Sequence, residues 1–235
     1  MPVPDAPASN MNGNLAARKL FAPIAPNYDR WSVLLSLGQD PRWRRELVER
    51  LDLPPGSKVL DVAAGTGLIT RLLEARGHEV VALDLSSEML KGAGLRGATA
   101  VIAAAEALPF QDETFDGLTF GYLLRYVKEP LDTMRELARI LHPGAPIGMV
   151  EFGRPRGIWG PLWWLYTRLG LPTAGVLAGP GWTRVGRFLG PSIDLFHREL
   201  PADGIAAVWK SAGLTDVRVA RRSLGGGLIV WARRP

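Results

Sequence analysis

The segment at residues 58–70, KVLDVAAGTGLIT, constrains the fold of this chain more than any other. Residues 59–62 form a short, mainly apolar run, as expected for a strand that is buried on both faces of a parallel sheet. Gly65 and Gly67 then favour a tight turn, and residues 68–73 carry apolar side chains at helical spacing. A strand, a glycine loop and a helix in this order bring backbone N–H groups and the positive end of a helix close to a ligand.

The rest of the chain alternates between strand-like and helix-like segments. Further strands are predicted at 79–84, 99–103, 115–121, 146–152, 217–219 and 228–231, and helices at 41–51, 87–91, 130–141 and 203–213, the last with Asp203 as its N-cap. This alternation predicts an α/β fold built on a doubly wound, mostly parallel, seven-stranded sheet. With 235 residues, the chain is long enough for one domain with a substantial core.

Three segments lie outside the alternation. Residues 1–14 are rich in Pro and Asn, and we expect a disordered lead with no signal peptide. The single domain is predicted to span residues 15–235. Within it, residues 15–55 are predicted to form a helical cap, and residues 153–201, rich in Gly, Pro and Trp, a substrate-cover insertion after the fifth strand.

Composition excludes several kinds of site. The chain has no cysteine, so it can form neither disulfides nor thiolate metal sites, and its three histidines are scattered, so no metal centre is predicted. The formal net charge is +5, but no dense basic run is interleaved with aromatic residues, so no nucleic-acid partner is expected. An anionic membrane surface accounts for this charge at least as well. The absence of cysteine suits a reducing cytoplasm, so we expect a cytoplasmic protein. The inner membrane surface is a further location that the charge allows.

The glycine loop departs from the dinucleotide-binding pattern G-x-G-x-x-G, because the third glycine position holds Thr70. Asp61 lies four residues before the first glycine, and Asp84 ends the next predicted strand, where an acid can bind ribose hydroxyls. This arrangement resembles motif I of the class I S-adenosylmethionine methyltransferases. It makes a nicotinamide-dependent oxidoreductase the weaker hypothesis.

This resemblance implies a set of residues that bind S-adenosylmethionine. The segment AAEALPF at residues 104–110 is similar to the methyltransferase segment that meets adenine, although Ala104 stands where a polar side chain is usual. Asp61 has an alternative role as a purely structural brace of the turn. The expected cofactor-binding residues are Tyr28, Asp61, Ala63, Gly65, Thr66, Gly67, Asp84, Leu85, Met89, Ala104, Ala105, Glu106 and Gly121.

Further motifs narrow the resemblance to the ubiquinone/menaquinone biosynthesis C-methyltransferase family. They are Tyr28-Asp29, AEALPF at 105–110, LRYV at 124–127, VEF at 150–152 followed by Arg154-Pro155, Phe188-Leu189, Ser192-Ile193 and GGLIV at 226–230. Two positions depart from the family pattern. Tyr126 replaces an asparagine, and Ala64 replaces a second glycine.

The resemblance implies C-methylation of a hydrophobic, quinol-type acceptor. S-adenosylmethionine carries a pre-activated methyl group, so catalysis requires mainly positioning and charge stabilisation. Arg125 is expected to stabilise a developing phenolate, because an arginine is always charged. Tyr28, Tyr126 and Glu151 are candidates to position the hydroxyl or to relay protons, with bracing of an arginine as the alternative role of Glu151.

The Trp-rich segment at 157–182 is interrupted by prolines and glycines, so no spanning helix is expected. Its tryptophans and flanking arginines predict either a mobile lid at a membrane surface or a helical cover that packs on the domain or on a second subunit of a homodimer. Two other functions stay open. One is O- or N-methylation of another hydrophobic small molecule, and the other is membrane binding by a decayed methyltransferase scaffold.

Overall fold

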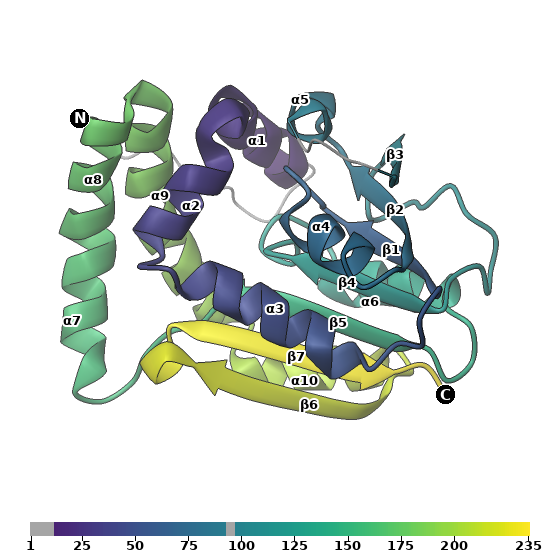
Figure 1. Cartoon of the computed structure of the whole chain (residues 1–235). Coiled ribbons are helices and arrows are strands. Elements are labelled where there is room, and N and C mark those ends of the chain that lie inside the picture. The colour runs from purple at the N-terminus through teal and green to yellow at the C-terminus, as the bar shows by residue number, and fades with distance from the viewer. Residues whose placement is uncertain (1–11, 93–96) are drawn as a thin grey trace.

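A computed structural model describes residues 12–92 and 97–235. Its centre is a seven-stranded sheet with the strand order β3-β2-β1-β4-β5-β7-β6 (Figure 1). The strands are β1 (Lys58–Val62), β2 (Glu79–Asp84), β3 (Thr99–Ile102), β4 (Gly117–Gly121), β5 (Pro146–Phe152), β6 (Thr215–Arg222) and β7 (Gly227–Arg233). Strands β1 to β5 are parallel, and β7 runs antiparallel to β5 and β6. The predicted doubly wound, mostly parallel sheet is confirmed.

Two helical layers cover the sheet. Helices α3 (Gln39–Leu51) and α4 (Leu68–Glu74) pack on one face, and α6 (Pro130–Arg139) and α10 (Ala202–Ser211) cover the other, while α5 (Ser87–Lys91) follows β2. Strand β1 shows how the sequence builds both cores, because successive side chains on a strand point to opposite faces. Val59 packs with the α3 and α4 residues, and Leu60 and Val62 pack with those of α6 and α10.

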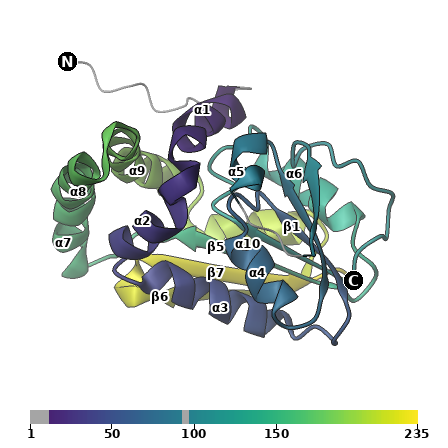
Figure 2. The same ribbon diagram turned by 45° about the horizontal axis from the view of Figure 1, so that its top comes forward.

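The N-terminal helices and the insertion after β5 form a third layer beyond the carboxyl ends of the strands. The N-terminal part contains α1 (Asn12–Phe21), a 3₁₀ turn (Ala22–Asn27) and α2 (Tyr28–Leu35). The insertion contains α7 (Trp159–Leu165), a π-helical turn (Tyr166–Gly170), α8 (Leu171–Ala178) and α9 (Pro180–Glu199). Figures 1 and 2 show α7 and α8 end to end at the outer edge of the molecule, with α9 beside them.

Glycines let α8 and α9 pack closely. A Cβ atom at Gly175 would lie 2.5 Å from the carbonyl oxygen of Trp182, and one at Gly186 would lie 2.4 Å from that of Leu171. Pro161 lies in the first turn of α7, where a missing N–H costs no helical hydrogen bond, and Pro172 directly follows the π-helical turn that leads into α8. The interruptions seen in the sequence therefore do not prevent a helical insertion.

Some element boundaries differ from the prediction. Helix α1 begins at Asn12, inside the predicted disordered lead, and residues 1–11 lie outside the described residues. The fourth strand begins at Gly117 rather than at residue 115, because Phe115 makes only an isolated bridge to Leu141. Pro201, not Asp203, is the N-cap of α10. Among the described residues, no helix is both long and apolar enough to span a membrane.

Candidate active site

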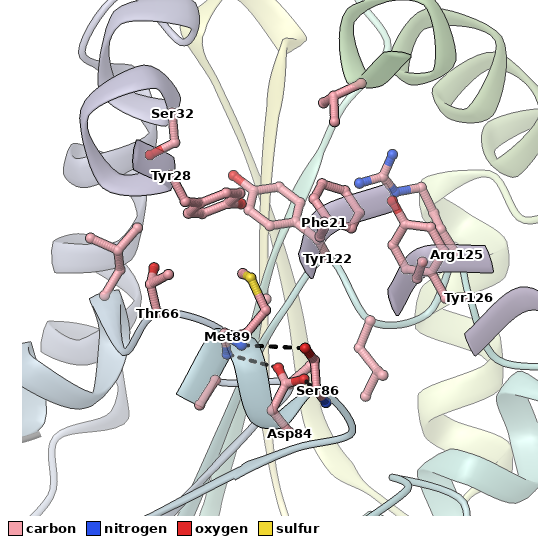
Figure 3. Close-up of a pocket in the computed structure, with 18 of the residues that line it drawn as sticks. Phe21, Tyr28, Ser32, Thr66, Asp84, Ser86, Met89, Tyr122, Arg125 and Tyr126 are labelled. Carbon is pink, nitrogen blue, oxygen red and sulfur yellow. Dashed lines mark hydrogen bonds between the residues drawn. The ribbon is translucent and has the colours of Figure 1, made fainter. Parts of the chain in front are cut away.

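A cavity of about 190 Å³ lies beyond the carboxyl ends of β1, β2 and β4, under the N-terminal helices and the insertion. Ligands of doubly wound sheets bind at this edge, where the strand order reverses between β1 and β4. Figure 3 shows Asp84, Ser86 and Met89 at one end of the cavity and Arg125 and Tyr126 at the other. The cavity therefore has two chemically different ends.

The glycine loop and Asp84 form the first end. Gly65 and Gly67 have positive φ angles of 59° and 74°, which glycine adopts without strain. The backbone N–H of Gly65 donates to Oδ2 of Asp84 at 2.8 Å, and that of Ser86 donates to Oδ1 at 2.8 Å. Asp84 lines the cavity, and burial raises its pKa. This carboxylate thus holds the loop and also presents acceptor oxygens to a ligand.

Apolar residues extend the same end of the cavity. The predicted cofactor-binding residues Ala63, Leu85, Met89, Ala104 and Ala105 line it, as do Thr66, Gly65 and Gly121. A Cβ atom at Gly65 would lie 3.3 Å from the methyl carbon of Met89, so loop and side chain are already in close contact. With Ala104 in place of a polar residue, this wall offers an adenine ring backbone groups and apolar surface.

Four of the predicted site residues do not line the cavity: Asp61, Gly67, Glu106 and Glu151. Asp61 lies beneath the loop, where the hydroxyls of Thr70 and Thr119 donate to it at 2.6 and 2.9 Å. Burial raises its pKa to about 6. This geometry corresponds to the structural brace that we considered as the alternative for Asp61. Glu106 is exposed, and Gly67 is the N-cap of α4.

Arg125 dominates the second end. Its guanidinium is buried, and Nε lies 3.1 Å from Oε1 of Glu151, which is itself 1% exposed. Burial alone would lower the pKa of Arg125, but the Glu151 carboxylate raises it above its usual value. The backbone N–H of Phe152 also donates to Glu151 at 2.7 Å. Glu151 therefore holds Arg125 in place rather than facing the cavity.

Unpaired polar atoms remain at this end. Among the described residues, Arg125 Nη1 and the Tyr126 hydroxyl are buried without a hydrogen-bond partner, although both residues line the cavity. The side chains of Phe21 and Phe188 pack around the Tyr126 ring. Buried polar atoms are rarely left unpaired in folded proteins. These two groups thus mark a position for a polar ligand atom in an apolar surrounding.

A second buried ion pair was not predicted from the sequence. Arg44 Nε donates to both carboxylate oxygens of Asp40 at 2.9 and 2.8 Å, and the Tyr122 hydroxyl donates to the same carboxylate. Both charged residues and Tyr122 line the cavity, as does Tyr28. Burial raises the pKa of Tyr28 to about 12, so this hydroxyl is protonated at neutral pH. Asp40 and Arg44 are four residues apart on a polar helix, a spacing that normally indicates an exposed pair.

The insertion supplies an apolar roof. Its cavity-lining residues are Trp163, Tyr166, Leu171, Trp182, Val185, Leu189 and Ile193. His197 does not line this cavity, and its Nε2 lies 2.6 Å from the carbonyl oxygen of Phe152. The roof suits a hydrophobic acceptor. Among the described residues, no group of His, Cys, Asp and Glu side chains could hold a metal ion.

Comparison with known sequences identifies a methyltransferase family. Residues 10–233 match the model of the ubiE/COQ5 methyltransferase family. The chain is similar to the demethylmenaquinone methyltransferase of Renibacterium salmoninarum, with 37% identity over 91% of this chain and 89% of that protein. It is also similar to the ubiquinone/menaquinone biosynthesis C-methyltransferase UbiE of Desulfotalea psychrophila, with 33% identity over 91% and 88%.

Solved structures agree on the fold. A methyltransferase of Thermotoga maritima, described as S-adenosylmethionine-dependent, superposes with a TM-score of 0.65 at 16% identity, over 93% of this chain and 99% of that one. Phosphoethanolamine N-methyltransferase 2 of Haemonchus contortus, solved with S-adenosylmethionine, gives a TM-score of 0.59 at 15% identity, over 82% of this chain and 52% of that one. The fold is therefore that of these methyltransferases, and the sequence matches over most of its length show that this chain belongs to the ubiE/COQ5 methyltransferase family.

Proposed function

We propose that this methyltransferase moves the methyl group of S-adenosylmethionine to a ring carbon of a hydrophobic quinol. The observation that carries the proposal is the cavity with two ends. The glycine loop and Asp84 form a nucleotide-type end, and the unpaired Arg125 and Tyr126 groups lie beneath an apolar roof at the other. The names of the relatives point to demethylmenaquinol as the acceptor.

The residues at the first end fit S-adenosylmethionine. Asp84 offers carboxylate oxygens at the end of β2, Gly65 leaves the backbone accessible, and Met89 and Ala105 give an apolar wall. When bound, this cofactor supplies a methyl group that is activated by a sulfonium. The protein therefore needs no covalent catalyst and contributes orientation and electrostatic stabilisation.

The residues at the second end fit a phenolic acceptor. A quinol ring carbon becomes nucleophilic when a neighbouring hydroxyl releases its proton to water, and the ring carbon releases its own proton to water once it carries the methyl group. Arg125 would stabilise the negative charge of the phenolate. The pKa values of Tyr28 and Tyr126 are raised by burial, so both hydroxyls stay protonated at neutral pH. They can therefore serve as hydrogen-bond donors to an acceptor oxygen and not as bases.

The product identifies the reaction. Purified protein is incubated with S-adenosylmethionine and a short-tailed demethylmenaquinol kept reduced, and the product is analysed by mass spectrometry and NMR. We expect one added methyl group on a ring carbon, and no product from the oxidised quinone, which lacks the hydroxyl. A methyl ether would instead identify an O-methyltransferase. Micromolar binding of S-adenosylhomocysteine without turnover of any quinol would contradict the proposed acceptor.

Arg44 extends the proposed cofactor site. Because β2 and β4 flank β1, Asp84 and Arg44 lie on opposite sides of the glycine loop, and a Cβ atom at Gly121 would lie 3.5 Å from Arg44 Nη1. Only Nε of Arg44 donates to Asp40. Among the described residues, its two terminal nitrogens donate no hydrogen bond, so they are available to a ligand. We propose that they bind the carboxylate of the cofactor's amino-acid group.

We expect Arg44→Gln to weaken the binding of S-adenosylhomocysteine by about 10- to 100-fold, the equivalent of about 1.5–3 kcal/mol for a charged hydrogen bond. Binding of 5′-methylthioadenosine, which lacks the amino-acid group, should be unchanged in the same calorimetric titrations. Asp40→Asn/Arg44→Gln removes the unpaired buried acid that the single substitution leaves. Arg50→Gln, which removes a half-exposed pair on the same helix, serves as the control. Equal losses for both ligands would indicate a structural role only.

We also propose that residues 157–182 contact a membrane surface, from which a hydrophobic acceptor would be taken up. Several large apolar side chains of this segment are exposed: Ile158, Trp159, Leu162, Trp164, Leu165, Leu169, Val176 and Leu177. Exposed apolar patches of this kind mark interaction sites, and tryptophan favours the membrane interface. The protein would then be cytoplasmic and bound peripherally to the inner membrane.

A further inference from the structure

A second pocket opens on the outer side of the insertion, between α7, α9 and β6. Its charged lining residues are three arginines, Arg154, Arg156 and Arg221, and one acid, Asp194. Trp163 lines both this pocket and the central cavity, so one indole separates the two. The arginine pocket, as we call it, is distinct from the site described above and has no part in the proposed reaction.

The arginine pocket has an uncompensated positive charge. Asp194 is already shared, because Oδ1 lies 3.3 Å from Arg154 Nε and Oδ2 lies 2.7 Å from Arg168 Nη2. Among the described residues, the side chains of Arg156 and Arg221 make neither an ion pair with an acid nor a hydrogen bond. A concave surface with two free guanidinium groups is suited to a phosphate, which accepts charge-assisted hydrogen bonds in this geometry.

The positive charge of the pocket also affects the pKa of His197. Its ring lines the pocket and is half-buried. Burial lowers the pKa of this imidazole, and the charges of Arg125, Arg221 and Arg154 lower it further, against a hydrogen bond to the carbonyl of Phe152 that raises it. The histidine is therefore neutral at pH 7 and adds no charge. The attraction for an anion comes from the arginines alone.

The pocket opens directly beside the exposed apolar face of α7. Trp164 lines the pocket and is 57% exposed, and the neighbouring Leu165 is 47% exposed. Figures 1 and 2 place α7 and α8 at the outer edge of the molecule. Positive charge and exposed aromatic and aliphatic side chains thus occur together at one edge, as in proteins that bind the surface of an anionic bilayer.

We infer that the arginine pocket binds the phosphate of an anionic phospholipid while the apolar residues of α7 and α8 enter the surrounding interface. This inference rests on the proposed membrane contact and names the lipid. A free phosphate would satisfy the arginines but leave the apolar face exposed to water. A second copy of this chain would cover that face, yet a twofold contact would bring two positive pockets toward each other. A lipid satisfies both features.

The test is flotation of the full-length protein with vesicles of phosphatidylcholine alone or mixed with phosphatidylglycerol. We expect the wild type to float with the mixed vesicles. Arg156→Gln/Arg221→Gln should bind them about tenfold or more weakly, since each arginine near an anionic surface strengthens binding by about fivefold. Arg218→Gln is the matched control, because Arg218 is exposed on the other face of the same edge strand, and its binding should be unchanged.

Two further variants separate the apolar contribution. Trp164→Ser/Leu165→Ser should lower binding to both kinds of vesicle, whereas Ile102→Ser, which alters an exposed isoleucine on β3 at the opposite edge of the sheet, should not. Equal wild-type binding to both vesicles, or full binding by the double arginine variant, would overturn the inference. The inference would also be overturned if inorganic phosphate bound saturably without reducing flotation. A protein that sediments as a stable dimer and does not float with vesicles would overturn it as well.

The same preparations distinguish this inference from the proposed reaction. Each variant is titrated with S-adenosylhomocysteine, and the two arginine substitutions should leave that affinity unchanged, because neither residue lines the central cavity. If the wild type did not bind S-adenosylhomocysteine, the proposed reaction would be contradicted, while the flotation result would still stand. Normal cofactor binding together with no lipid dependence would contradict only the lipid site.

Discussion

Replacing Asp84 by alanine should weaken the binding of S-adenosylhomocysteine by at least about 100-fold. A carboxylate that accepts hydrogen bonds from two ribose hydroxyls contributes about 1.5–3 kcal/mol for each bond. The substitution also removes the acceptor for the N–H groups of Gly65 and Ser86, so the loop loses the side chain that holds it. Calorimetric titration of the wild type and the variant measures the loss directly.

Two controls separate binding from folding in this experiment. Asp84→Asn keeps one oxygen that can accept from Gly65, so its melting temperature should stay near that of the wild type while affinity still falls. Asp132→Ala removes an exposed acid of α6 that pairs with Arg135 at the surface, and it should bind normally. An Asp84→Ala protein that is folded and binds within about threefold of the wild type would exclude the ribose contact.

The glycine loop and Asp84 were predictable because their positions follow from local patterns. A short apolar run followed by glycines fixes the strand and the turn, and the carboxyl ends of parallel strands always meet at one edge of the sheet. An acid at the end of β2 therefore had to lie beside the loop that follows β1. The sequence did not reveal that Asp84 also accepts from Gly65 and Ser86, because those contacts depend on the exact path of the loop.

Arg44 and Asp40 could not be found in this way, because their burial depends on contacts with distant strands. Helix α3 packs against β5 and β7 so closely that a Cβ atom at Gly148 would lie 2.6 Å from Leu47, and one at Gly227 would lie 2.4 Å from Trp43. Glycines inside strands do indicate a close approach of another element. They do not indicate which helix approaches, so the polar pair on α3 looked like an exposed one.

The insertion shows the limit of reading prolines as interruptions. Pro161 and Pro172 were expected to prevent a spanning helix, and none occurs among the described residues. The chain nevertheless stays helical from Trp159 to Ala178, because Pro161 lies in the first turn of α7 and Pro172 follows a π-helical turn. The position of a proline within its helix decides its effect, and that position depends on where the preceding segment ends. Composition indicated that this segment is apolar and rich in tryptophan, but neither its helical shape nor the exposure of its side chains.

Removing the charge of Arg125 should reduce turnover by about 100- to 1,000-fold while leaving the affinity for S-adenosylhomocysteine unchanged. This is the usual effect on kcat of deleting one group that stabilises developing negative charge. Arg125→Ala on its own leaves Glu151 buried without a partner, and such a loss destabilises a protein by about 3–5 kcal/mol. Arg125→Met/Glu151→Gln removes both charges and gives the cleaner measurement.

The comparison with Arg125→Lys identifies what the guanidinium does. Lysine keeps the positive charge but not the planar set of donors, so it should recover part of the lost kcat if charge is what matters. Arg125 Nη1 and the Tyr126 hydroxyl are both unpaired and belong to residues at the same end of the cavity, so Tyr126→Phe should lower turnover in the same direction but by less. If the folded double variant turns over demethylmenaquinol at the wild-type rate, the phenolate cannot lie against Arg125. The acceptor would then have to bind elsewhere under the apolar roof.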